Sequence, residues 1–193
     1  MFSNKDLRKL IIPLIIEQIL AVAVGMADTV MVSRVGESAI SGVSLVDAIA
    51  ILLIGLFSAM ATGGSVVAAQ YLGGKNTEKA NESAKQLLLS ISVLSILLTI
   101  ISVIGNRTIL SLIYGDLAVD VMKNASVYFY ITALSYPFLA IYNGCAALFR
   151  VMGNSKTSMK ISIIMNSINI VGNALCIFVL KMGVKGVAIP TLI

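Results

Sequence analysis

The stretch LIIPLIIEQILAVAVGMADTVMV, residues 10–32, is long and apolar enough to cross a lipid bilayer as one helix. A spanning helix needs about 20 predominantly apolar residues. Further runs of this kind follow at residues 47–71, 87–104, 125–149 and 161–180. Because no soluble fold needs five such runs in succession, we predict an all-α, polytopic membrane helix bundle.

The composition agrees with a membrane environment. Apolar residues make up 58% of the chain and charged residues 12%, whereas a soluble domain has about 45–50% and about 25%. The first run is also longer than the apolar core of a signal peptide, which spans about 7–15 residues. We therefore interpret residues 10–32 as a retained first helix.

A sixth apolar stretch, GVAIPTLI, occupies residues 186–193. At 1.5 Å per residue it covers only about 12 Å of a hydrocarbon core that is about 30 Å thick. We therefore expect residues 1–193 to form a single transmembrane domain. It would contain five complete transmembrane helices and the start of a sixth, with the chain truncated early in helix six.

The 14 Lys and Arg residues are divided unevenly between the two sides of the predicted spans. The side that holds the N-terminus is the more basic one, and the positive-inside rule assigns it to the cytoplasm. We predict a multi-pass protein of the cell membrane that contacts membrane lipid and has no nucleic-acid partner. The basic loops are interpreted as orientation signals, with binding of anionic lipid as the alternative. The more basic side has Lys5, Arg8, Lys9, Lys75, Lys79, Lys85, Arg150, Lys156 and Lys160, and the other has Arg34, Arg107, Lys123, Lys181 and Lys185.

Two carboxylates, Glu17 and Asp28, interrupt the first apolar run. Eleven positions separate them, which is close to three helical turns, so both should lie on one face. Such groups are costly in the bilayer and normally face the bundle interior or a wet cavity. Asp28 is a candidate functional acid and Glu17 a candidate cavity acid. The alternative for each is a helix-packing contact with a neighbouring hydroxyl.

A second polar row occurs in the fifth run, where Asn166, Asn169 and Asn173 share one helix face and Ser162 extends it. Amide oxygens can bind a hard cation or share a proton network with a carboxylate. The alternative is interhelical hydrogen bonding with no further role. With Asp28 as a partner, we favour a functional row.

A buried carboxylate beside amide groups suits the exchange of H⁺ or Na⁺, because removal from water favours the protonated form of the carboxyl. Enzymatic functions are less consistent with the sequence. The chain has no His, and its YGD motif at residues 114–116 lies in a predicted loop rather than in a span. We therefore expect a transporter that is not an enzyme and that uses no cofactor.

The residues that surround these acids resemble the multidrug and toxic compound extrusion (MATE) family. VGMADTVMVSRVG at residues 24–36 resembles the first-helix signature of that family. Four other stretches resemble the family in order and spacing: AAQYLGGKN, ALFRVMGNSKT, the NxxxN row and KMGVKGVAIPT.

The resemblance implies the N-terminal lobe of a twelve-helix exporter, with the C-terminal lobe missing from this chain. It also implies a cation or proton site at Asp28, Asn169, Asn173 and Thr191. Asn173 stands where the family pattern has a second acid, which lowers the charge of a Na⁺ site and favours H⁺ at Asp28.

Three functions are compatible with these features. The first is a secondary active antiporter that exports organic cations or drugs in exchange for H⁺ or Na⁺. The second is a flippase for lipid-linked sugars from the same superfamily, although such proteins tend to have several Arg in the cavity and no Arg lies within these spans. The third is a truncated membrane protein that does not transport.

Overall fold

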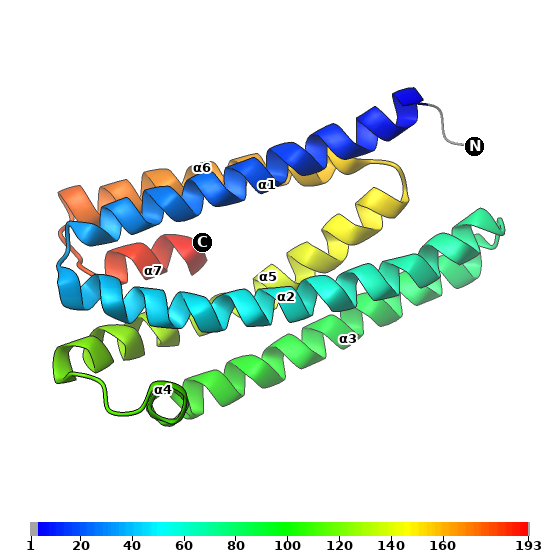
Figure 1. Cartoon of the computed structure of the whole chain (residues 1–193). Helices are drawn as coiled ribbons and strands as arrows, with labels where there is room; N and C mark the ends of the chain where they lie inside the picture. Colours follow the sequence, from blue (N-terminus) through cyan, green and yellow to red (C-terminus); the bar gives the residue numbers. More distant parts are fainter. Residues whose placement is uncertain (1–3, 193) are drawn as a thin grey trace.

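The protein is a bundle of long helices, shown in Figure 1 as a computed structural model that describes the backbone of residues 4–192. Within the described residues, five helices are long and apolar enough to cross a membrane. The five predicted spans are therefore confirmed, and a short helix follows the fifth. The helices are α1 (Asn4–Ser33), α2 (Glu37–Gly73), α3 (Thr77–Ile104), α4 (Asn106–Tyr114), α5 (Val119–Val151), α6 (Ser155–Ala174) and α7 (Lys185–Leu192), with a π-helical turn η1 (Leu175–Val179) after α6.

Large apolar side chains cover much of the outer surface. Leu52 in α2 is 74% exposed and Ile104 at the end of α3 is 81% exposed. Water would disfavour so much exposed apolar surface, whereas lipid chains solvate it. The outer surface therefore suits a bilayer.

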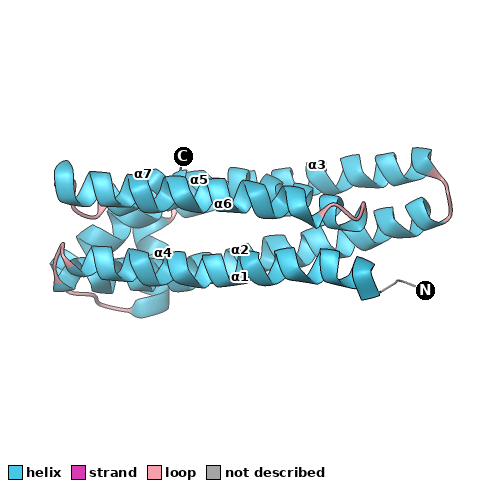
Figure 2. Ribbon diagram, turned by 90° about the horizontal axis from the view of Figure 1, so that it is seen from above, coloured by secondary structure: helices cyan, strands magenta, loops and turns pink. Residues whose placement is uncertain are grey.

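The helices form two closely packed groups. Helix α1 packs mainly on α6, whereas α2, α3 and α5 pack on one another. The short helix α7 contacts both α5 and α6 and so joins the two groups. Figure 2 shows the long helices side by side along one common direction. Contact between α1 and α2 is sparse, and this leaves room for a cavity between the groups.

The connections gather at two opposite ends of the bundle. The N-terminus and the α2–α3 and α5–α6 turns lie at one end, and the α1–α2 turn, α4 and the α6–α7 connection lie at the other (Figure 1). This is the grouping of loops that the sequence predicts. The assignment of the more basic end to the cytoplasm remains a prediction.

The helices extend beyond the apolar runs that predict them. Helix α2 begins at Glu37, whereas the apolar run begins at residue 47. Hydropathy drops at each charged residue, but the backbone hydrogen bonds of the helix continue through charged residues. The apolar run therefore underestimates the length of the helix. Helix α4 is likewise missing from the prediction. It lies between Gly105 and Gly115, and the latter has a φ of 71°.

Close packing of α2 against α3 depends on Gly64. A Cβ atom at this position would lie 2.5 Å from Cδ1 of Leu87. Small residues allow membrane helices to approach closely in this way. At Gly64 the two helices therefore approach closely.

Candidate functional site

The polar row on α6 faces the interior of the bundle. Asn173 is fully buried, with 0% exposure, although it is an amide in a predominantly apolar helix. The Nδ2 group of Asn166 donates a hydrogen bond of 3.1 Å to Oγ of Ser162. Asn166 and Ser162 are therefore hydrogen-bonded within the row, whereas Asn169 and Asn173 at its other end contact other helices.

A continuous chain of hydrogen bonds links three helices at that end. Nδ2 of Asn173 donates to Oδ1 of Asp28 in α1 at 2.6 Å and to Oδ1 of Asn169 at 3.1 Å. Nδ2 of Asn169 donates to Oγ1 of Thr191 in α7 at 3.2 Å. The structure thus brings together Asp28, Asn169, Asn173 and Thr191, the four residues that the family resemblance groups.

Close contact between α6 and α7 keeps Thr191 in reach of this chain. A Cβ atom on Gly172 would lie 2.8 Å from Cβ of Pro190, so the two backbones can approach only because residue 172 is glycine. Thr191 also donates from Oγ1 to the carbonyl oxygen of Val187, at 3.2 Å. Its hydroxyl is therefore held in position by its own helix.

One polar atom within this chain of hydrogen bonds lacks a partner. Oδ1 of Asn173 is buried and accepts no hydrogen bond from the described residues. A buried acceptor without a donor is costly, at about 1–3 kcal/mol. A protonated carboxyl or a bound cation would satisfy this oxygen, and the group is therefore suited to binding one of them.

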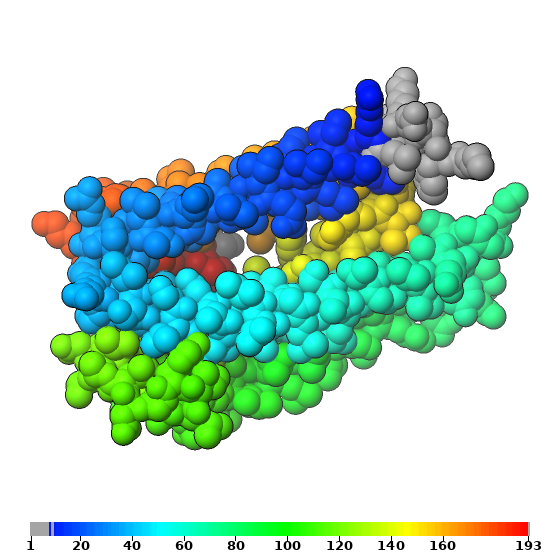
Figure 3. All heavy atoms as spheres, viewed as in Figure 1, coloured from blue at the N-terminus to red at the C-terminus, as the bar shows by residue number. Residues whose placement is uncertain are grey.

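A cavity of about 460 Å³ lies beside the chain, between the two helix groups. Figure 3 shows the surface hollowed between α1 and α2, with parts of α5 and α7 visible in the depth. Among the residues described as lining the cavity there are two acids and no Lys or Arg. The polar lining residues are Asp28, Asp47, Tyr128, Thr132, Ser135, Tyr136, Asn166, Asn169 and Thr191.

Asp47 is the functional candidate that sequence reasoning missed. It lies within α2 and lines the same cavity as Asp28, so Asp28 is not the only acid near the Asn row. The hydroxyl of Tyr128 in α5 donates to Oδ1 of Asp47 at 3.0 Å. Asp47 is the first residue of the run at residues 47–71, and Ile51 and Ile54 follow it at helical spacing, a signal that could have identified it.

Glu17 has a different environment. Its Oε1 atom accepts a hydrogen bond of 2.7 Å from Oγ of Ser158 at the start of α6. Glu17 and Asp28 both contact α6, which confirms that they share a face of α1. However, Glu17 does not line the cavity that contains Asp28. Its assignment as a cavity acid therefore stays a prediction, and the contact with Ser158 is the hydroxyl contact between helices that the alternative expects.

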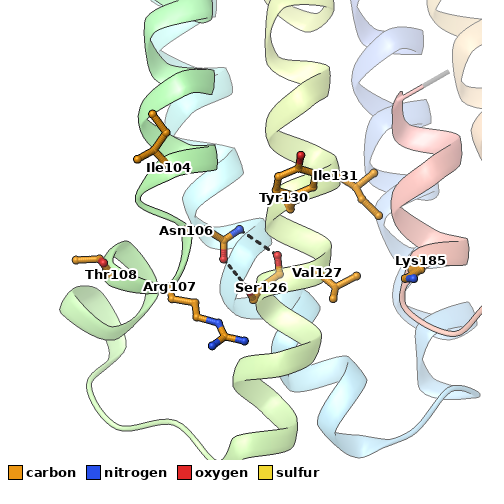
Figure 4. Close-up of a pocket in the computed structure, with 9 residues that line it drawn as sticks. All are labelled: Ile104, Asn106, Arg107, Thr108, Ser126, Val127, Tyr130, Ile131 and Lys185. Atoms are coloured by element: carbon orange, nitrogen blue, oxygen red, sulfur yellow. Dashed lines mark hydrogen bonds between the residues drawn. The ribbon is translucent and has the colours of Figure 1, made fainter.

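A second hollow, of about 550 Å³, lies where α3, α4 and α5 meet and has no residue in common with the Asp28 cavity. Figure 4 shows its central pair, in which Ser126 Oγ donates to Asn106 Oδ1 at 2.6 Å and Asn106 Nδ2 donates to the Ser126 carbonyl at 3.0 Å. This pair satisfies its own polar groups. The Asp28 cavity is therefore the better candidate site.

Comparison with known proteins identifies a family. The MatE family model matches residues 13–175. The uncharacterized transporter YisQ of Bacillus subtilis is 29% identical over 183 residues, which is 93% of this chain and 40% of YisQ. The probable multidrug resistance protein NorM of Thermotoga maritima is 24% identical over 197 residues, which is 98% of this chain and 41% of NorM.

Solved structures share the fold. A MOP superfamily transporter from Pyrococcus furiosus matches with a TM-score of 0.90 and 22% identity, over 97% of this chain and 41% of that one. A MATE transporter in complex with MaD3S matches with a TM-score of 0.91 and 22% identity, over 97% and 42%. The chain thus spans about 40% of the length of the relatives that it matches.

Proposed function

Because this chain belongs to the MatE family of membrane transporters, we propose that it works as part of a secondary active antiporter that exports organic cations or drugs in exchange for H⁺ or Na⁺. The observation that supports this proposal best is the hydrogen-bonded chain from Asp28 through Asn173 and Asn169 to Thr191, beside a cavity. The chain covers about 40% of its relatives' length, so transport is proposed for the natural protein.

Protonation of Asp28 would change the hydrogen bonding at the site. The ionised carboxylate accepts from Nδ2 of Asn173, whereas a protonated carboxyl also donates. Oδ1 of Asn173 has no donor among the described residues, so it is an acceptor that could gain from such a change. A proton on Asp28 would therefore favour a rearranged contact between α1 and α6.

A Na⁺ ion would use the same oxygens. Sodium is a hard cation and, like Ca²⁺ and Mg²⁺, prefers carboxylate, carbonyl and hydroxyl oxygens. Asp28 would supply the charge, and Asn169, Asn173 and Thr191 would supply neutral oxygens. With one carboxylate in direct contact with Asn173, the ionised site suits a singly charged ion.

The charge of the cavity supports a cationic cargo. Asp28 and Asp47 line it and the described lining residues include no Lys or Arg. A low-dielectric cavity of one sign concentrates ions of the other sign. A phosphate-linked sugar would be repelled, so this lining does not favour the flippase alternative.

The test is efflux from proteoliposomes that contain the natural protein. Ethidium efflux is driven first by a pH gradient and then by a Na⁺ gradient. We expect Asp28→Asn to abolish the driven component, because the amide cannot exchange a proton or neutralise Na⁺. The matched control is Asp116→Asn in the exposed α4–α5 connection, which should leave efflux unchanged. Driven efflux that survives Asp28→Asn would show the proposal to be wrong.

A further inference from the structure

The two walls of the cavity differ in chemistry. The α1–α6 wall presents Asp28, Asn166 and Asn169, which have oxygen ligands for a small ion, beside apolar residues such as Val24 and Ile168. The α2–α5 wall presents one acid, Asp47, together with phenol and aliphatic side chains. The other residues of this wall are Ala50, Ile51, Ile54, Tyr128, Thr132, Ser135, Tyr136 and Leu139.

Asp47 and two aliphatic residues lie on one face of α2. Ile51 and Ile54 follow Asp47 by four and seven positions, so they line the cavity in a row beneath the carboxylate. A carboxylate above an apolar surface does not resemble a site for a hydrated metal ion. It matches a molecule that has a positive group at one end and an apolar body.

Tyr136 provides independent evidence for a ligand on this wall. Its side chain lines the cavity and is only 1% exposed, yet its hydroxyl is buried without a hydrogen-bond partner among the described residues. The ring is held edge-on against Phe57, with centroids 6.4 Å apart. A buried hydroxyl of this kind is costly unless a ligand supplies its partner.

The Asp47–Tyr128 contact leaves binding capacity unused. Tyr128 donates to Oδ1 of Asp47, and no hydrogen bond to Oδ2 occurs in the described part of the chain. A carboxylate can accept several hydrogen bonds. The second oxygen of Asp47 is therefore available to an N–H donor that enters the cavity.

We propose that Asp47 and Tyr136 bind the charged N–H group of an organic ammonium cation, at a site distinct from the coupling-ion site at Asp28, while Tyr128 contacts the Asp47 carboxylate and not the cation. This inference rests on the proposed function and assigns its cargo to one wall. Asp47 supplies the opposite charge, and the Tyr136 hydroxyl accepts from an N–H group of the cation. Ile51, Ile54 and Leu139 contact its apolar body.

The first experiment measures equilibrium binding to the natural protein in lipid nanodiscs. The probes are proflavine, a flat cation with N–H donors, and tetraphenylphosphonium, an apolar cation without them. We expect Asp47→Asn to weaken both probes by at least about tenfold, since each loses its opposite charge. We expect Tyr136→Phe to weaken only proflavine, by about three- to tenfold, the effect of one hydrogen bond. The control Glu37→Gln, an exposed acid of α2, should leave both within about twofold.

A structural role for Asp47 makes a different prediction. If Asp47 and Tyr128 only joined α2 to α5, Tyr128→Phe would weaken binding as much as Asp47→Asn does. We expect Tyr128→Phe, which keeps the carboxylate, to bind both probes within about threefold of the unmodified protein. Equal losses in the two variants, or unchanged binding in Asp47→Asn, would overturn the proposal.

Chemical labelling of the unmodified protein avoids any loss of folding. A carbodiimide modifies accessible carboxyl groups in the membrane, and mass spectrometry measures the reaction at Asp47 and at Asp28. We expect proflavine to slow labelling of Asp47 by at least about fivefold, and that of Asp28 by less. Absence of protection at Asp47 would overturn the inference.

The outcomes also separate this inference from the proposed function. If Asp28→Asn leaves driven efflux intact while Asp47→Asn loses binding, the coupling role fails and the cargo site stands. If Asp28→Asn abolishes driven efflux while Asp47→Asn binds normally, only the cargo site is overturned.

Discussion

At the scale of single residues, Asn173 determines the charge of the coupling site. It is fully buried and donates to both Asp28 and Asn169. A carboxylate at this position would lie within hydrogen-bonding distance of Asp28. Two ionised acids so close repel each other unless a cation or a proton lies between them.

Asn173→Asp should therefore increase the response of the protein to Na⁺. We expect thermal unfolding to shift upward in NaCl relative to choline chloride at equal ionic strength. A ligand at 100 times its Kd stabilises the folded state by about 2.7 kcal/mol. The unmodified protein, with one acid fewer, should show a smaller shift.

The control for this substitution is Asn166→Asp. Asn166 lies on the same row, but its side chain donates to Ser162 rather than to Asp28. We expect its Na⁺-dependent shift to equal that of the unmodified protein. If both variants showed the same shift, a negative charge anywhere in the row would be enough to increase the response to Na⁺. That result would contradict a site centred on Asp28 and Asn173.

Some of these residues can be predicted from the sequence and some cannot. Asp28 and the Asn row are evident because a carboxylate or a periodic amide row is conspicuous in an apolar helix. Thr191 follows only from the family resemblance, since nothing in its neighbourhood marks it. Asp47 was missed for a physical reason, because it is the first residue of its apolar run and a charge at that position is typical of the end of a span.

At the scale of elements, the α6–α7 contact controls the geometry of the site. Helix α6 ends in a π-helical turn, in which the Leu180 amide donates to the Leu175 carbonyl at 3.0 Å. The helix and this turn form one continuous span, Ser155–Val179, in agreement with the predicted run to residue 180. The chain leaves the helix after this turn, where Lys181 and Gly183 have positive φ values. The apolar run predicts the span but not the change to π-helical hydrogen bonding, because hydropathy does not distinguish the two kinds of helix.

Gly172→Ala should separate α6 from α7. The new Cβ atom would lie 2.8 Å from Cβ of Pro190, whose ring cannot rotate away. We expect a loss of about 1–3 kcal/mol of stability, the usual cost of overpacking, together with a weaker Asn169–Thr191 contact. Thermal unfolding in lipid nanodiscs measures the first effect.

Gly63→Ala is the control for this comparison. No atom lies within 4 Å of a Cβ at that position in the middle of α2. Alanine is favoured over glycine in a helix by about 1 kcal/mol, so stability should stay the same or rise. A similar loss in both variants would contradict the argument from the Pro190 contact.

At the scale of the whole molecule, the basic residues predict which end faces the cytoplasm. The end with the N-terminus and the α5–α6 turn has more Lys and Arg than the end with the α4–α5 connection. The structure groups the loops into these two ends. The orientation itself follows only from the positive-inside rule.

Cysteine labelling of intact cells tests this orientation. In a background without Cys145 and Cys176, we expect Asp116→Cys to react with a membrane-impermeant maleimide. Asn154→Cys should react only after the cells are permeabilised. Both positions are exposed, so accessibility to the reagent depends on the side of the membrane. The reverse pattern would place the N-terminus outside.

The sparse contact between α1 and α2 has a mechanical consequence. Asp28 is bonded within the α1–α6 pair, and Asp47 is bonded within the group of α2, α3 and α5. A rigid-body motion of one helix group relative to the other would widen or narrow the cavity, and each acid would move with its own group. Separation of the two groups would leave the Asp28–Asn173 and Asp47–Tyr128 hydrogen bonds intact. Such a motion would vary the distance between the two carboxyl groups, with α7 in contact with both helix groups.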